Sequence, residues 1–230
     1  MTKQGEAKYP LLFDDKEHFY AEPFGKASDL REFVDIQVML LHKKGRLLEL
    51  GAGSGGFSYL FAKCGFEVTG MDISPHMSEI AKNRFAKDGS VKINFITGDM
   101  EDISFDKEFE AIVIHDALHH CPNYRLVIAN AFKSLKNGGE LILAEPSLLH
   151  LISPHARKAV KDYTVTELGF SRFQLRRILK KTGFKAVRNF YPGIESYGPN
   201  PLIFLANLLK VIFNRFAFFP GEKILIRAVK

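Results

Sequence analysis

The stretch LLELGAGSGG, residues 47–56, places four glycines in ten positions directly after a short apolar run. Glycine lets the backbone turn sharply and approach a ligand closely. Residues 45–50 are predicted to form a strand, and residues 57–65 a helix that ends at Gly65. The N-terminus of a helix after such a turn points N–H groups and the positive end of its dipole at negative charge. The stretch therefore predicts a strand–turn–helix unit that can bind a phosphate or a carboxylate.

The same alternation continues along the chain. Ser74 followed by Pro75 predicts the start of the next helix, because serine caps a helix N-terminus and proline suits its first position. Strands that alternate with helices at this spacing predict a parallel, doubly wound sheet. Further strands are expected at 66–73, 91–99, 109–116 and 140–146, with helices at 74–87 and 123–139 between them.

Beyond Pro146 the pattern changes to helices at 153–163 and 170–184 and strands at 184–191 and 222–230. Ser171 and Gly183 predict the two ends of the second helix. An amphipathic first helix is predicted at 27–41 from its apolar spacing. The residues predicted to form its apolar face are Leu30, Phe33, Val34, Val38 and Leu41, and those predicted to face the core from the 170–184 helix are Phe173, Leu175, Ile178 and Leu179.

The bulk composition fits one globular domain. The 230 residues are 46% hydrophobic and 25% charged, which excludes wholesale disorder. We expect a single α/β domain with a Rossmann-like, seven-stranded, mostly parallel sheet, helices on both faces and an antiparallel C-terminal strand. Within 1–230 its parts are an N-terminal cap and first helix at 1–44, a cofactor-binding core at 45–146, and substrate-side helices with a closing strand pair at 147–230, including an apolar insert at 199–221.

The net charge of +6 is unevenly distributed. Residues 1–152 carry 17 Lys and Arg against 22 Asp and Glu, and residues 153–230 carry 15 against 4. A basic C-terminal third favours an anionic partner or is a solvated surface. The N-terminus shows no apolar segment of a secretory signal, and Cys64 and Cys121 form no disulfide or metal-binding pattern, so we expect a cytoplasmic protein.

Acidic residues at the ends of the expected strands decide what the glycine turn binds. Gly51, Gly53 and Gly56 also satisfy the G-x-G-x-x-G pattern of dinucleotide-binding proteins, which is weak alone. Asp72 can accept both hydroxyls of a ribose, and Asp99 can accept from an adenine amino group. Glu49 would repel a pyrophosphate but attracts an ammonium or sulfonium cation.

With E-x-G-x-G-x-G at Glu49–Gly55, the acid Asp72 and the pair Asp99 and Met100, the chain resembles a class I S-adenosylmethionine-dependent methyltransferase. The resemblance covers roughly residues 45–146 and implies that S-adenosyl-L-methionine is the cofactor. It also implies that the N-terminal segment closes over the cofactor, with Tyr20 or Phe24 near its sulfonium. The cofactor-binding residues that it implies are Glu49, Gly51, Ala52, Gly53, Gly55, Phe57, Asp72, Ile73, Asp99, Met100 and His115.

Methyl transfer to a hydroxyl group needs a route for its proton. Ligands bind outside the carboxyl ends of such strands, so the loops HDALHH and AEPS are expected to flank the acceptor. We predict that His119 is the general base and that Glu145 orients it or steers the acceptor, with His120 as the alternative base. Either imidazole can instead be structural. No metal is expected, because His119 and His120 are adjacent and His155 lacks ligand spacing, and Asp116 is expected to cap a loop or contact the cofactor.

The segment 201–219 is the strongest apolar run, with a narrow basic stripe. We expect it to form a membrane-surface helix, a lid over the acceptor, or a dimer contact, in a monomer or homodimer. A looser resemblance to methyltransferases of sugar and polysaccharide biosynthesis places O-methylation of a sugar, glycan or lipid-linked intermediate first, and a quinone or isoprenoid-like acceptor second. An RNA methyltransferase, or a cofactor-binding protein without catalysis, is less favoured, because no base-flipping signature follows the fourth strand.

Overall fold

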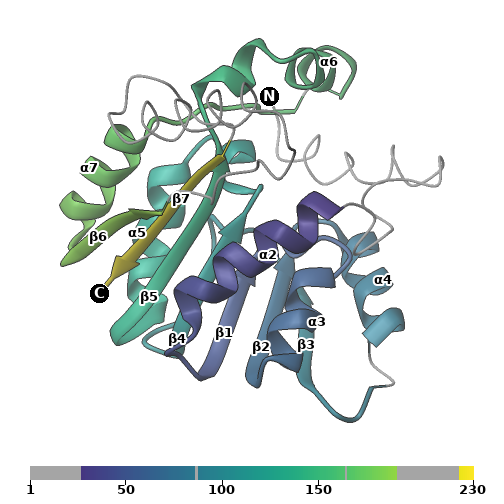
Figure 1. Cartoon of the computed structure of the whole chain (residues 1–230). Helices are drawn as coiled ribbons and strands as arrows, with labels where there is room; N and C mark the ends of the chain where they lie inside the picture. The colour runs from purple at the N-terminus through teal and green to yellow at the C-terminus, as the bar shows by residue number, and fades with distance from the viewer. Residues whose placement is uncertain (1–26, 86–87, 164, 191–222) are drawn as a thin grey trace, which may run out of the picture.

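The computed structural model describes residues 27–85, 88–163, 165–190 and 223–230 of the chain. These residues form a seven-stranded sheet in the order β3-β2-β1-β4-β5-β7-β6 (Figure 1). Neighbouring strands from β3 to β5 are parallel, whereas β7 is antiparallel to both β5 and β6. The Rossmann-like fold class predicted from the sequence is confirmed. The strands are β1 Gly45–Leu50, β2 Phe66–Asp72, β3 Lys92–Thr97, β4 Phe109–His115, β5 Leu135–Pro146, β6 Ala186–Phe190 and β7 Lys223–Val229.

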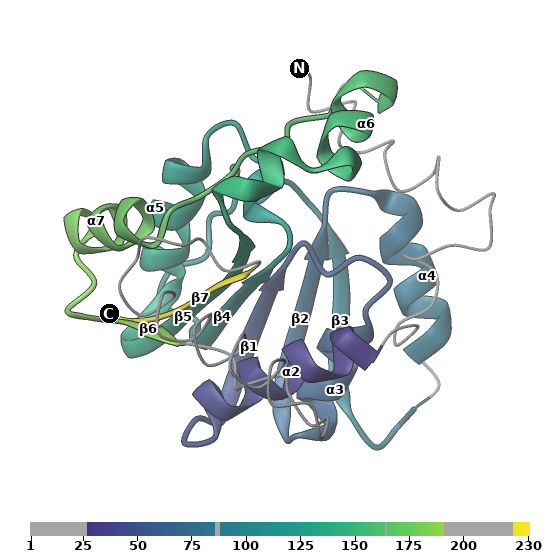
Figure 2. The same cartoon turned by 45° about the horizontal axis from the view of Figure 1, so that its top comes forward.

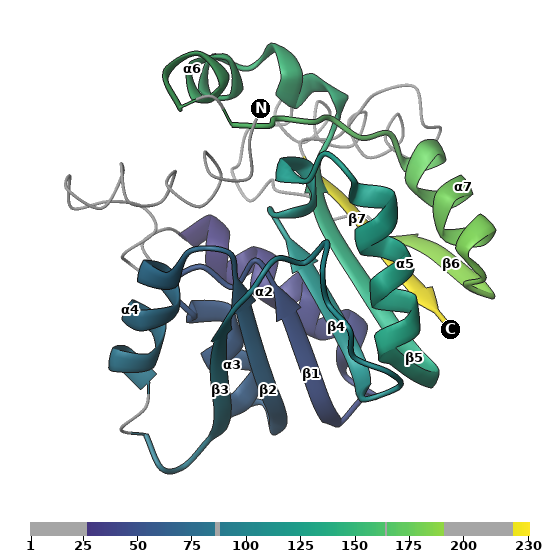
Figure 3. The ribbon, with the colours of Figure 1, turned by 180° about the vertical axis from the view of Figure 1, so that it is seen from behind.

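Helices cover both faces of the sheet (Figures 1 and 3). On one face α2 and α3 pack on alternate residues of β1, β2, β4 and β5, and α4 continues this layer over β3. On the other face α5 and α7 pack on the intervening residues, as expected for strands that are buried on both sides. The α-helices are α2 Ala27–Leu40, α3 Gly56–Lys63, α4 Pro75–Phe85, α5 Tyr124–Ser134, α6 Pro154–Tyr163 and α7 Arg172–Thr182.

Two 3-10 turns follow the central strands and were not anticipated from the sequence. The first, η1 Leu118–His120, comes directly after β4, and the second, η2 Leu148–Ile152, comes after β5. Figure 2 shows that α6 lies at the end of the sheet where β1, β2 and β4 finish, on the side of the strand-to-helix loops. In open α/β sheets ligands bind at this carboxyl edge, so the loops that gather here are the candidates for a binding site.

The predicted helix at 123–139 is wrong in its last five residues, 135–139. The helix α5 ends at Ser134, and Leu135 already belongs to β5. Leu135 is fully buried and pairs with Phe109, with an irregularity in register before Glu140 pairs with Ala111. The double glycine that suggested a helix end lies instead inside the extended segment, because burial of Leu135 in the core outweighs the local helix preference.

Two predicted helix faces also need correction. In α2 the buried side is formed by Phe33, Ile36, Met39 and Leu40, whereas the predicted apolar positions Leu30, Val34, Val38 and Leu41 are exposed. In α7 Leu175 and Leu179 are buried as predicted, but Phe173 is 73% exposed. The helices are correctly placed in both cases, but of the residues predicted to form the apolar face of the first helix only Phe33 is buried. The predicted ends of α7 are confirmed by the Ser171 side chain, which accepts from Gln174 N–H, and by Gly183 at φ 118°.

Several predicted features lie outside the described residues: the N-terminal cap with Tyr20 and Phe24, and the segments 199–221 and 201–219. The division of 1–230 as one domain stays a prediction. Among the helices that the structure describes, none has the length and apolar character needed to cross a bilayer.

Replacing Gly51 by alanine is expected to destabilise the fold. Gly51 has φ +80°, and an added Cβ would lie 2.3 Å from the Ala117 Cβ. Left-handed strain and overpacking together predict a loss of about 2–4 kcal/mol in the free energy of unfolding, measured by urea denaturation. Gly89→Ala is the matched control, because among the described residues no atom lies within 4 Å of an added Cβ there, and the φ of Gly89 is not in the left-handed region. An equal effect of the two substitutions would contradict the steric account.

Candidate functional site

The glycine turn and Asp72 are bound to each other at the carboxyl edge of β1 and β2. Asp72 accepts from the backbone N–H of Gly53 at 2.8 Å and from that of Ser74 at 2.9 Å. Burial raises the pKa of Asp72, and the two N–H donors oppose this. No atom of the described residues lies within 4 Å of the position that a Cβ of Gly53 would take. The turn thus leaves open space on the side where a ligand could approach it.

Glu49 is the second predicted ligand-binding acid and is buried at the end of β1. Its carboxylate accepts a hydrogen bond from the Ser58 hydroxyl on α3. Burial raises the pKa of Glu49 from 4.5 to about 7, and the Ser58 hydrogen bond opposes the rise. A buried carboxylate attracts a positively charged group, so the site fits the ammonium or sulfonium part of the implied cofactor.

The remaining predicted cofactor residues lie on neighbouring strand ends. Asp99 follows β3 and accepts from Glu101 N–H at 2.8 Å. Ala52 N–H donates to the Met71 carbonyl at 2.9 Å, which holds the glycine turn against the end of β2. Because β3, β2, β1 and β4 are adjacent in the sheet, these positions gather along one edge. The edge also carries Ile73 after β2, Met100 after β3, and Gly55, which precedes α3 at φ 83°.

His115 at the end of β4 belongs to a charged cluster that the sequence did not reveal. Its ring stacks on Phe57 with centroids 4.6 Å apart, and its Nε2 lies 2.6 Å from the Glu32 carboxylate on α2. Asp116, at φ 47°, is hydrogen-bonded to Lys223 at the start of β7, and Lys223 is 3.2 Å from Glu32. Burial lowers the pKa of His115, but Asp116 and Glu32 outweigh it and raise that pKa. The contact between Phe57 and His115 brings together two of the predicted cofactor residues.

His119 and Glu145 form a buried pair, as their predicted roles require. Glu145 Oε2 lies 2.9 Å from His119 Nδ1, and both residues are at most 5% exposed. The other ring nitrogen, Nε2, lies 3.7 Å from the carboxylate of Glu167. Burial lowers the pKa of His119, but Glu145, Asp116 and Glu167 outweigh it, so the net shift is upward. The geometry is that of an imidazole oriented by a carboxylate, and the catalytic role stays a prediction.

His120, the alternative base, has a different environment. Its Nδ1 lies 2.9 Å from the carbonyl oxygen of Thr166. Burial and the neighbouring His119 lower the pKa of His120 to about 4, so its ring is neutral near pH 7. A group with so low a pKa is a weak proton acceptor, and the structure favours His119 over His120 as a base.

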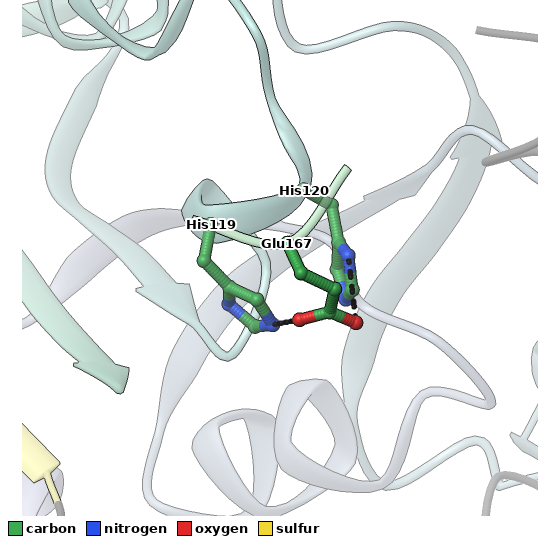
Figure 4. A group of neighbouring side chains, drawn as sticks. All are labelled: His119, His120 and Glu167. Carbon is green, nitrogen blue, oxygen red and sulfur yellow. Dashed lines mark ion pairs between the residues drawn. The ribbon is translucent and has the colours of Figure 1, made fainter. Parts of the chain in front are cut away.

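Sequence reasoning missed Glu167 and His150, which complete this cluster. The Glu167 carboxylate lies 2.6 Å from His150 Nε2 and faces both His119 and His120 (Figure 4). Burial raises the pKa of Glu167, but the three imidazoles outweigh it and lower that pKa. The absence of a metal site was expected from spacing along the chain, which cannot detect a carboxylate from a distant loop. Among the described residues, His119, His120 and Glu167 each offer a ligand atom within 4.8 Å of the others, and so do Glu32, His115 and Asp116.

Comparison with known proteins shows which family the chain resembles. Residues 47–139 match the model of the methyltransferase domain family. The chain is 30% identical over 177 residues to the protein MJ1123 of Methanocaldococcus jannaschii, covering 74% of this chain and 80% of that protein. It is 33% identical over 135 residues to a demethylmenaquinone methyltransferase of Tropheryma whipplei, covering 59% of this chain and half the length of that relative.

A third relative is a ubiquinone biosynthesis O-methyltransferase of Coxiella burnetii, 30% identical over 152 residues, covering 63% of this chain and 62% of that protein. Among solved structures, a phosphoethanolamine N-methyltransferase of Haemonchus contortus in complex with S-adenosyl-L-methionine has the same fold. It matches 96% of this chain and 60% of that chain with a TM-score of 0.67 and 19% identity. The chain belongs to the class I S-adenosylmethionine-dependent methyltransferases.

The raised pKa of Glu49 predicts a pH-dependent stability. The folded state holds the Glu49 proton up to about pH 7, whereas the unfolded chain releases it near pH 4.5, so folding stability falls as pH rises between these values. The expected fall is about 3 kcal/mol, because each pKa unit corresponds to roughly 1.4 kcal/mol. Urea denaturation at pH 5 and pH 8 measures it. Glu49→Gln removes this contribution, so other titrating groups cancel in the comparison, and identical pH profiles for the two proteins would refute the assignment.

Proposed function

We propose that this chain transfers a methyl group from S-adenosyl-L-methionine to a hydroxyl group of a small, largely apolar acceptor of the quinol type. The observation that carries the proposal is the buried His119–Glu145 pair at the carboxyl ends of β4 and β5. Two relatives that act in quinone biosynthesis by name support this acceptor class over a sugar. When bound, S-adenosyl-L-methionine supplies an electrophilic methyl group on its sulfonium. We propose that the acids Glu49, Asp72 and Asp99 bind this cofactor.

The protein's contribution is positioning and proton removal. Holding the acceptor oxygen in line with the methyl group is worth roughly 7–11 kcal/mol in favourable cases. As the oxygen gains the methyl group it must lose its proton, and Nε2 of His119 is the atom proposed to take it. Glu145 fixes the ring by accepting from Nδ1, and it stabilises the imidazolium that forms.

The surface beside this pair supports an apolar acceptor. The turn η2 begins three residues after Glu145, and its side chains Leu148, Leu149, Leu151 and Ile152 are each between 45% and 61% exposed. Large apolar side chains clustered on a surface commonly mark a binding site for an apolar ligand or surface. A quinol ring with an isoprenoid tail presents this combination of one reactive hydroxyl and extended apolar surface.

A lipid-linked glycan intermediate is the second candidate, and the neighbouring helix favours it. In α6 the side chains of Arg157, Lys158 and Lys161 are exposed next to the apolar turn η2. Basic groups beside an apolar surface suit a lipid-linked phosphate or an anionic membrane surface. We propose a small-molecule or lipid-linked acceptor in both cases, reached from the η2 side, and no role for nucleic acid.

Binding and turnover with defined compounds test the proposed activity. Isothermal titration calorimetry is expected to detect S-adenosyl-L-methionine and S-adenosylhomocysteine but not NADH. Production of S-adenosylhomocysteine is then expected with a short-chain hydroxylated benzoquinol and not with free hexoses. Turnover only with a lipid-linked sugar would replace the first candidate by the second, and binding of NADH without the methyl donor would overturn the activity itself.

His119→Asn is expected to lower kcat by about 10²–10⁴ and leave the dissociation constant for S-adenosyl-L-methionine unchanged. Asparagine can still donate to Glu145, so the substitution removes the proton acceptor with little change in the surroundings. His42→Asn is the matched control, because His42 lies at the opposite end of β5 and pairs with Glu140. If His119→Asn left kcat unchanged, His119 would be excluded as the base. If the loss of kcat then appeared in His120→Asn, His120 would take that role.

A further inference from the structure

The side chains of His119, His120 and Glu167 converge from two separate segments. The histidines belong to η1, and Glu167 belongs to the loop between α6 and α7 (Figure 4). Backbone contacts hold the two segments together, since Leu168 N–H donates to the His119 carbonyl at 2.9 Å. The three side chains therefore occupy positions fixed by the fold and not by chance contact of mobile groups.

This cluster holds two buried carboxylates, and their ion-pair partners among the described residues carry imidazole groups. The side chains of Glu145 and Glu167 are 0% and 2% exposed. Within the part of the chain that the structure describes, their ion-pair partners are all histidines. The Glu32, His115 and Asp116 cluster differs, because Lys223 lies inside it and supplies a permanent positive charge. Buried carboxylates need hydrogen-bond donors or a cation, and among the described residues no lysine or arginine pairs with these two.

The hydrogen bond to Glu145 leaves the other ring nitrogen of His119 facing a second carboxylate, that of Glu167. A carboxylate only accepts, so the contact with Glu145 places the proton on Nδ1 and leaves the lone pair on Nε2 of a neutral ring. That lone pair faces the Glu167 oxygen at 3.7 Å, which is longer than a hydrogen bond. Two electron-rich atoms that face each other across this gap attract a cation between them.

We propose that His119, His120 and Glu167 form a binding site for one divalent transition-metal ion of the Zn²⁺ class. Imidazole nitrogen and carboxylate oxygen are ligands that Zn²⁺ prefers, at bond lengths of about 2.0–2.2 Å. Such bonds place tetrahedral ligand atoms about 3.3 Å apart. The ligand atoms here lie within 4.8 Å of one another, so they must approach one another by up to about 1.5 Å when the ion binds.

The surroundings have the character of an outer shell for a metal. Ligand histidines in metal sites donate their other N–H to a carboxylate or a backbone carbonyl, which fixes the ring and increases its basicity. His119 makes this contact with Glu145. The Glu167 carboxylate is held from the other side by His150. A three-ligand site leaves at least one coordination position for water or for another ligand.

One consequence rests on the proposed function. The lone pair on His119 Nε2 that would bind the metal is the same one that is proposed to take the acceptor's proton. Occupancy by Zn²⁺ therefore removes the base and inhibits methyl transfer, and removal of the metal restores it. The site is thus a metal-sensitive control point within the methyl-transfer site.

The binding test uses the full chain freed of metal with EDTA and dialysed. Calorimetry is expected to show one Zn²⁺ bound per chain, and Co²⁺ is expected to give visible d–d absorption bands of a low-coordinate site. Glu167→Gln keeps the side-chain shape and removes the ligand charge, so its affinity for Zn²⁺ is expected to fall at least tenfold. His120→Asn, at a partly exposed position, gives a second ligand deletion, and His42→Asn is the control that keeps full affinity. Thermal melts confirm that each variant is folded.

The activity test separates this inference from the proposed function. Zn²⁺ is expected to inhibit the wild-type chain reversibly with EDTA, and to inhibit Glu167→Gln only at ten times higher concentration or more. Absence of Zn²⁺ binding, or equal affinity in the wild type and both ligand variants, would overturn the metal site while leaving turnover by the metal-free chain as evidence for the proposed function. Site-specific binding that accelerates turnover would overturn both the inhibition and the base role of His119.

Discussion

The buried carboxylate of Glu145 is the interaction on which the reactive edge of the sheet depends. Its two oxygens accept from the backbone N–H groups of Ala117, Leu118 and His119 at 2.9–3.3 Å and from the His119 ring. A carboxylate removed from water is costly by several kcal/mol unless its hydrogen bonds are made, so η1 must stay folded against the end of β5. Three consecutive N–H donors and one imidazole thus hold η1, which follows β4, against the end of β5.

The fixed position of η1 also determines where the loop between α6 and α7 lies. The His119 carbonyl accepts from Leu168 N–H, and Ser147, next to β5, forms a bridge with Phe170. The loop between α6 and α7 is thereby held at both η1 and the end of β5, and Glu167 is carried into contact with the imidazoles. The position of Glu167 therefore depends on tertiary contacts: Glu145 holds η1 in place, and η1 holds the loop that carries Glu167.

This dependence explains which parts of the site were predictable from the sequence. Glu49, Asp72 and Asp99 were identifiable because each stands at the end of an apolar segment, and parallel strands bring their carboxyl ends to one edge. Glu167 and Lys223 carry no such signal, since an isolated polar residue has no period and its partner is far along the chain. The end of α5 was misplaced for a related reason: a local glycine signal at 138–139 was overridden by burial of Leu135 against Phe109.

The two charged clusters on this edge differ in the cation that neutralises them, and this difference determines what each can do. Burial lowers the pKa of Lys223, but Asp116 and Glu32 outweigh it and raise that pKa, so its ammonium stays charged and acts as a permanent structural cation beside His115. The Glu145 carboxylate faces the His119 imidazole, which carries a positive charge only while it holds a second proton. A lysine ammonium that stays charged suits a binding surface of constant charge. A group that can gain and lose a proton, such as an imidazole, is required where a proton must be transferred. This difference supports our proposal that proton transfer takes place beside β5, whereas the Lys223 cluster beside β7 is structural.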